Sequence, residues 1–135
     1  MLKRVWLVAL VAALAMPACA KRPDESNLRE SFTAQIAKIS NVTDLALSGD
    51  VLTFLGPDGR DGTASWLVRI DSIGLSPGSS ELLSHEGHIL SSWWRDGELI
   101  EPLGAMSGLP DVFLDIGIAQ DCYALWDTVS NTWDW

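Results

Sequence analysis

The only two histidines, His85 and His88, lie together in the segment His85-Glu86-Gly87-His88, whose residue types could hold a metal ion. A zinc-binding helix typically places two histidines four positions apart with a glutamate between them, and the ion needs at least one further ligand. Here the histidines are three positions apart. The chain has no third histidine, and no pair of cysteines lies near them in the sequence. Gly87 and the serines before it favour a solvated loop. We therefore expect neither a metal site nor a cofactor.

Asp58 and Asp61, each followed by a glycine, have the residue types of a calcium-binding loop. An EF-hand loop needs oxygen ligands at its first, third and fifth positions and a glutamate at its twelfth, and this segment does not meet that pattern. Turn formation by Asp and Gly explains the segment better. The chain also lacks a G-x-S-x-G elbow, a phosphate-binding glycine loop and an S-x-x-K pair. We predict no catalytic residues and a non-enzymatic protein.

Tryptophan is the one compositional excess, and six of the seven tryptophans follow the first twenty residues. Trp93 and Trp94 are adjacent, and a β-strand points consecutive side chains to opposite faces. One of the two is therefore expected to be at least partly exposed, or covered by a helix or loop. Trp93 and Trp94 are the candidate partner-binding residues, because an exposed tryptophan can contact a protein or stack on a sugar ring. The alternative is that both simply fill and cover a small core.

The start of the chain has the pattern of an export signal. Two cations, Lys3 and Arg4, precede twelve uncharged apolar residues from Val5 to Met16, and small residues follow. Twelve helical residues reach about 18 Å, whereas the hydrocarbon core of a bilayer is about 30 Å thick. The segment therefore indicates a secretory signal peptide and not a membrane span.

The residues Ala15-Met16-Pro17-Ala18-Cys19 resemble the lipobox of bacterial lipoproteins, although Pro17 departs from the usual small or aliphatic residue. The resemblance implies that residues 1–18 are removed and that Cys19 carries a diacylglycerol and an acylated amino terminus. Ala20 stands where many inner-membrane lipoproteins have Asp, so the resemblance favours the outer membrane, facing the periplasm. The alternative is cleavage after Ala20, which would give a soluble periplasmic or secreted protein.

Charge narrows the range of partners. Beyond the signal the chain has seven basic and eighteen acidic residues, a net charge near −11. Nucleic-acid binding requires clustered Lys and Arg, so we expect no nucleic-acid partner. Binding to anionic lipid through charge is equally disfavoured, which leaves the lipid on Cys19 as the attachment to the membrane.

Periodicity indicates a single α+β domain over residues 27–135, joined to the anchor by a tether at residues 19–26. An amphipathic helix is expected over Ser26–Ile39, with Ser26 as its cap, because apolar residues recur every three or four positions. We expect this N-terminal helix to pack on a small antiparallel sheet of five to seven short strands. A second short helix is expected to begin at Pro110 and to end at Gly117.

The strands are expected where apolar residues alternate between turn-forming residues. They comprise a hairpin within 45–55, then 65–73, a hairpin of 88–94 with 98–101 that turns at Asp96-Gly97, and finally 123–126 with 132–135. Cys122, beside the strand at 123–126, is expected to be a buried small hydrophobe.

These observations predict a small exported lipoprotein that acts as a binding or structural module of the cell envelope. Its partners would be the membrane, through Cys19, and an envelope protein or glycan. Two alternatives stay open: a protein inhibitor or immunity-type factor, and an enzyme acting on envelope glycan. Two carboxyl groups about 5–10 Å apart in a cleft beside an exposed tryptophan would favour the enzyme.

Overall fold

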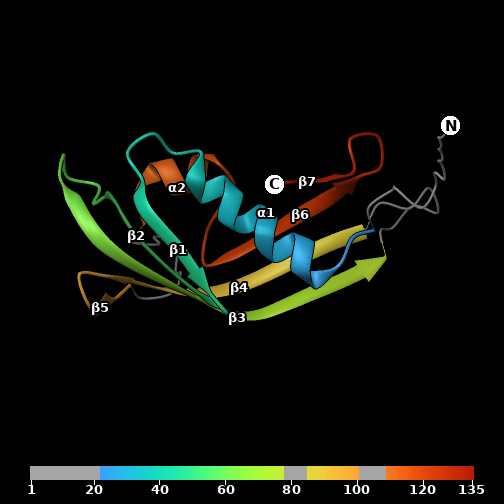
Figure 1. Ribbon diagram of the computed structural model, residues 1–135, viewed down its shortest axis with the longest axis horizontal. Coiled ribbons are helices and arrows are strands. Elements are labelled where there is room, and N and C mark those ends of the chain that lie inside the picture. Colours follow the sequence, from blue (N-terminus) through green and yellow to red (C-terminus); the bar gives the residue numbers. More distant parts are fainter. Residues whose placement is uncertain (1–21, 78–84, 101–108) are drawn as a thin grey trace, which may run out of the picture.

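The computed structural model describes residues 22–77, 85–100 and 109–135 (Figure 1). Its elements, in chain order, are α1 Glu25–Ala37, β1 Thr43–Ser48, β2 Val51–Pro57, β3 Thr63–Pro77, β4 His85–Arg95, β5 Glu98–Leu99, α2 Asp111–Asp115, β6 Asp121–Asp127 and β7 Thr132–Asp134. The expected signal at 1–18, the residues Cys19, Ala20 and Lys21, and residues 78–84 and 101–108 lie outside the described residues.

One seven-stranded sheet carries the fold. Its order is β1-β2-β3-β4-β6-β7, β5 pairs with β4, and every pair is antiparallel. The sheet is strongly curled (Figure 1). Its presence confirms the prediction of an antiparallel sheet with two helices. Two strands are not short, however: β3 has 15 residues and β4 has 11, because they pair with each other from Trp66 to Pro77 across a bulge at Asp71.

The strands bury alternate residues, so the sheet has two unlike faces. On β4 the buried positions include Ile89 and Trp93, and on β6 they are Cys122, Ala124 and Trp126. We call this side the inner face and the opposite side the outer face. The inner face carries the core, in which Trp66, Trp93, Phe54 and Phe113 form edge-to-face and tilted ring contacts.

Helix α1 begins earlier than expected, because Asp24 rather than Ser26 is its cap. The Asp24 carboxylate accepts a hydrogen bond from the Asn27 backbone N–H at 2.7 Å, and the Asn27 side chain accepts one from the Asp24 N–H at 3.0 Å. Glu25 and Ser26 thus belong to the helix and not to a tether. The helix is also not at the N-terminus of the chain, since 24 residues precede it.

The buried side of α1 consists of Leu28, Phe32 and Ile36, which belong to the same core as the inner face. The C-terminal tryptophans also reach the helix. Trp133 donates from its indole N–H to Asn27 at 2.8 Å, and Trp135 donates to Ser31 at 2.8 Å. These bonds join the last strand of the sheet to the first turns of α1.

The histidine segment is a strand and not a loop. His85, Glu86 and Gly87 pair with the last three residues of β3, and His88 continues the same ladder. The loop prediction was wrong because it considered only the local preference of Gly87 and the nearby serines for turns. Pairing with the long strand β3, which local sequence does not reveal, keeps them extended.

The remaining turns largely lie where the sequence predicts them. Asp96 and Gly97 both have positive φ, 53° and 83°, as a two-residue hairpin turn of this kind requires. Gly117, at φ 82°, follows the end of α2. Pro110 is the residue before that helix and not its first helical residue.

Candidate functional site

The two adjacent tryptophans lie on opposite faces of β4. Trp93 is fully buried on the inner face, and Trp94 is partly exposed on the outer face. This agrees with the expectation from strand geometry. Of the two candidate partner-binding residues, only Trp94 is therefore accessible to a partner.

Neighbouring polar side chains hold Trp94 in place. The Arg69 guanidinium carbon lies 5.1 Å from the centroid of the Trp94 ring, within the range of a cation–π contact. Arg69 Nε is 2.6 Å from the Asp71 carboxylate, and the Ser92 hydroxyl donates to the same carboxylate at 2.5 Å. Because these groups satisfy one another, Arg69 is fixed over the ring and Trp94 is preorganised.

A hollow of about 340 Å³ opens beside Trp94. It is lined by Thr53, Ser65, Trp66, Leu67, Trp94 and Gly97. The pairing between β3 and β4 explains the position of the hollow. On one side of Trp94 along these strands, Arg69 pairs with Ser92; on the other side, the Ser65 carbonyl accepts a hydrogen bond from the Asp96 N–H. The hollow and Arg69 therefore lie on opposite sides of the Trp94 side chain.

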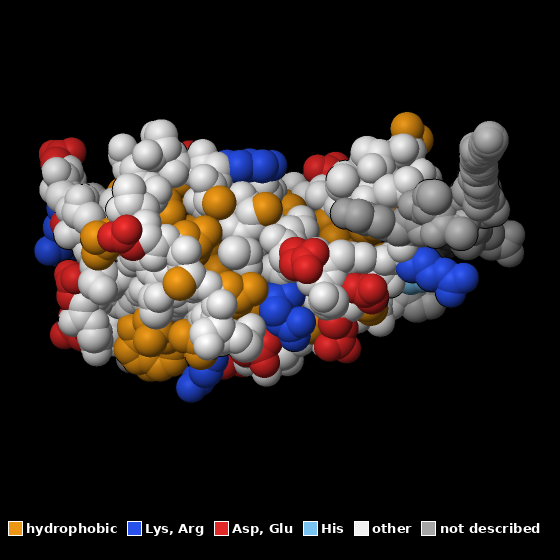
Figure 2. Space-filling view, in the orientation of Figure 1, with side chains coloured by type: hydrophobic (Ala, Val, Ile, Leu, Met, Phe, Trp, Pro, Cys, Tyr) orange, Lys and Arg blue, Asp and Glu red, His pale blue; other side chains and the backbone are white. Residues whose placement is uncertain are grey.

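Apolar side chains continue this region across the outer face. Leu67 is the direct cross-strand neighbour of Trp94, and Leu99 of β5, which is 47% exposed, pairs with Trp94 from the other side. Figure 2 shows hydrophobic side chains gathered at the end of the molecule that carries β5, with acidic side chains both at that end and along the rest of the visible surface. An exposed apolar patch of this kind is typical of a binding surface.

A second group lies at the other end of the outer face. His88 Nε2 is 2.6 Å from the Asp121 carboxylate, and the His88 ring stacks on Tyr123 with 4.2 Å between centroids. Tyr123 is 54% exposed. His85 and His88 are three positions apart in one strand, so they point to opposite faces and do not form a pair of ligands there.

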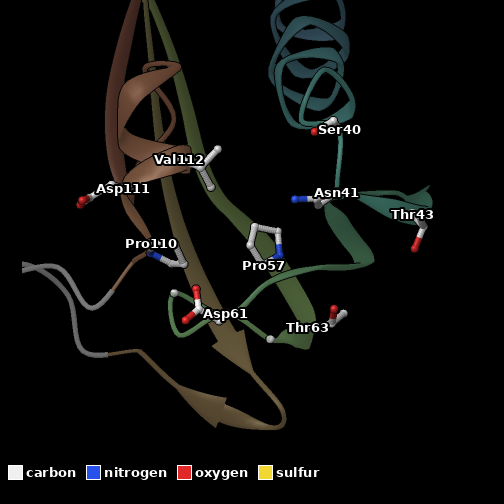
Figure 3. A pocket seen from close by; sticks show the side chains of 11 residues that line it. Ser40, Asn41, Thr43, Pro57, Asp61, Thr63, Pro110, Asp111 and Val112 are labelled. Atoms are coloured by element: carbon white, nitrogen blue, oxygen red, sulfur yellow. The ribbon is translucent and has the colours of Figure 1, made fainter.

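A pocket of about 710 Å³ lies at the end of α1 near the turn between β2 and β3 (Figure 3). Its lining is mainly polar and includes Ser40, Asn41, Asp61, Thr63 and Asp111. No tryptophan lines it, so the carboxylates of Asp61 and Asp111 are not combined with the Trp94 hollow. The arrangement expected of a glycan-cleaving enzyme is therefore not found at either site.

Asp58, considered above as a calcium ligand, organises the turn that borders this pocket. Its carboxylate accepts hydrogen bonds from the backbone N–H groups of Arg60 at 2.6 Å and Gly62 at 3.1 Å. These bonds lower the pKa of Asp58, since they favour the ionised carboxylate. This geometry is that of an Asx turn, in agreement with the turn interpretation.

Among the described ranges, no three His, Cys, Asp or Glu residues gather closely enough to hold a metal ion. Cys122 is 5% exposed, and burial, followed by the nearby Asp121 charge, raises the pKa of its thiol from 9.0 to about 11. A neutral buried thiol is a weak nucleophile, so Cys122 belongs to the core, as expected.

Sequence reasoning missed the side chains around Trp94. Arg69 and Asp71 have the i, i+2 spacing that places two residues on one face of a strand, and this signal could have been used. Ser92 has the same spacing from Trp94 within β4. Thr53 and Ser65 come from other strands, and only the strand register brings them to Trp94.

No known protein family model matches this chain, and neither does any curated protein or solved structure. In the part of the chain that the structure describes, no helix is both long enough and apolar enough to cross a bilayer. The site must therefore be interpreted from its own geometry.

Proposed function

We propose that this chain is an exported lipoprotein, anchored through Cys19, that acts as a non-enzymatic binding module of the cell envelope. One observation carries the binding role: the inner face of the sheet holds the core, whereas the outer face presents the preorganised Trp94 beside an apolar hollow. A tryptophan fixed in this way loses little freedom on binding a partner.

The distance from Cys19 to the domain supports an anchored arrangement. Only residues 19–24 separate the proposed lipid from α1, and six extended residues span at most about 20 Å. The described chain starts at one end of the long axis, and β5 and the end of β4 lie toward the other (Figure 1). An anchored domain would thus expose the Trp94 region away from the bilayer.

We place the anchor in the outer membrane, facing the periplasm, because Ala20 follows the proposed lipidated cysteine. A large acidic excess would prevent the domain from adhering to anionic lipid by charge, so the acyl chains would be its attachment.

Replacing Cys19 tests the anchor. The Cys19→Ala chain should leave the membrane fraction, and the intact mass of the native protein should equal a chain starting at Cys19 plus a diacylglycerol and one acyl group. Cys122→Ala is the matched control and should stay in the membrane, because Cys122 is buried in the domain. Membrane retention of Cys19→Ala, or an unmodified mass starting at Lys21, would contradict the proposal.

A further inference from the structure

The hollow beside Trp94 contains no charge. None of its six lining residues is ionisable. Charged groups near Trp94 are also engaged within the protein: Arg69 pairs with Asp71, and the Asp96 carboxylate accepts the Ser65 N–H at 2.9 Å. On a domain with eighteen carboxylates, this hollow has an uncharged lining. Such a lining suits an uncharged ligand, and an acidic ligand would be repelled by the rest of the domain.

The lining combines an aromatic side chain with hydroxyl groups. Trp94 and Leu67 offer apolar surface, while Thr53 and Ser65 supply hydroxyl groups that both donate and accept hydrogen bonds. Gly97 contributes no side chain, and apart from its two chain neighbours no residue has an atom within 4 Å of where its Cβ would be, so this side of the hollow stays open. A volume of about 340 Å³ is near the lower limit of ligand pockets, which suits a single ring.

We propose that this hollow binds a neutral sugar ring of an envelope glycan, with the apolar face of the ring stacked on Trp94. The hydroxyl groups at the ring edge would bond to Thr53 and Ser65. This inference rests on the proposed binding role and names its ligand class. No bond of the sugar is broken, since the lining contains no acid or base.

The test is a calorimetric titration of the full chain, purified in detergent, with a neutral β-1,4-linked tetramer of N-acetylglucosamine. Binding should saturate and change little between about 0.05 and 0.5 M salt, because no ion pair contributes. Trp94→Ala should weaken binding about tenfold, and Trp94→Phe should weaken it less because a flat ring remains. Thr53→Val, which removes one hydroxyl group, should also weaken it.

Tyr123→Ala is the matched control, since Tyr123 is an exposed aromatic residue on the same face but outside the hollow. It should bind the tetramer as the unchanged chain does. Near-ultraviolet circular dichroism checks that each variant is folded. Failure of the folded chain to bind the tetramer would overturn the proposal, and so would equal binding by Trp94→Ala. Binding of a leucine-rich peptide in place of the sugar would also overturn it and assign the hollow to a protein partner.

The outcomes for the anchor and for the ligand are separable. An unmodified chain starting at Lys21 that binds the tetramer through Trp94 would refute the anchor and support the sugar site. An acylated chain that binds no saccharide would do the reverse.

Discussion

At the scale of single residues, the face of the sheet to which a side chain points decides whether that side chain is buried or exposed. Trp93 and Trp94 are chemically identical neighbours, yet Trp93 contacts Trp66 and Phe113 in the core while Trp94 lies under Arg69 on the outer face. The same alternation separates His85 from His88 and buries Cys122. Identical residue types therefore have different energetic roles.

Truncation of the two tryptophans should show this difference in stability. Trp93→Ala should lower the free energy of unfolding by about 3–5 kcal/mol, because it leaves a cavity among packed rings. Trp94→Ala should cost about 1 kcal/mol, mainly the contact with Arg69. Urea unfolding followed by far-ultraviolet circular dichroism measures both. Equal losses would show that the assignment of the two faces is wrong.

The Cys122 thiol should make stability depend on pH in the alkaline range. In the unfolded chain this thiol ionises above about pH 9, whereas burial keeps it neutral to about pH 11 in the fold. The contribution of the neutral thiol to the free energy of unfolding is therefore complete below about pH 9, and it falls by about 3 kcal/mol as the pH rises to about 11. The urea midpoints at these two pH values should differ less in Cys122→Ala, which lacks the thiol, than in the unchanged chain. An identical pH dependence in both chains would contradict the burial of Cys122.

At the scale of elements, local signals position α1 and the turns, whereas pairing between distant segments determines the strands. The capping box at Asp24 and Asn27 starts α1 within its own sequence. By contrast, β4 includes His85 only because the end of β3 lies beside it. Close contact between α1 and the sheet also requires Gly87, where an added Cβ would lie 2.8 Å from a methyl carbon of Leu28.

The position of the cap can be tested with two neighbouring substitutions. Asp24→Ala should lower the free energy of unfolding by about 1 kcal/mol, because it removes the acceptor for the Asn27 N–H. Ser26→Ala, in the first turn, should change it by less than about 0.5 kcal/mol. Thermal or urea unfolding of the two variants distinguishes them, and a larger loss for Ser26→Ala would restore Ser26 as the cap.

At the scale of the whole molecule, the two ends of the domain differ. Trp133 bonds to the first turn of α1, so the turn between β6 and β7 lies near the start of the described chain. Ser40 and Asp61 line one pocket, so the turn between β2 and β3 lies beside the other end of α1 (Figure 3). Thirteen helical residues separate these ends by about 20 Å. If Cys19 is anchored, the first end is the one near the bilayer.

Fluorescent labels at the two ends should therefore respond differently to the membrane. Val129→Cys, at a position 92% exposed in the turn between β6 and β7, should be quenched more strongly by lipids with spin-labelled head groups than Arg60→Cys in the turn between β2 and β3. The measurement uses the full acylated chain in vesicles. Equal quenching would contradict the proposed orientation, and removal of Cys19 should abolish quenching at both positions.

The sequence by itself determined the features that depend on a few neighbouring residues. The apolar repeat at Leu28, Phe32 and Ile36 predicted α1, Asp96-Gly97 predicted a hairpin turn, and alternation predicted an antiparallel sheet. It also predicted that Trp93 and Trp94 lie on opposite faces, because side-chain alternation is a property of any strand.

Only the tertiary structure decided which tryptophan is buried, why His85 is in a strand, and which side chains surround Trp94. Each depends on the register between strands that are distant in the chain, such as the pairing of Arg69 with Ser92. Register is set by burying one whole face of the sheet against the core, and a shift of one residue would reverse every side chain. The register is therefore a property of the assembled sheet, and the residues around Trp94 in the sequence do not determine it by themselves.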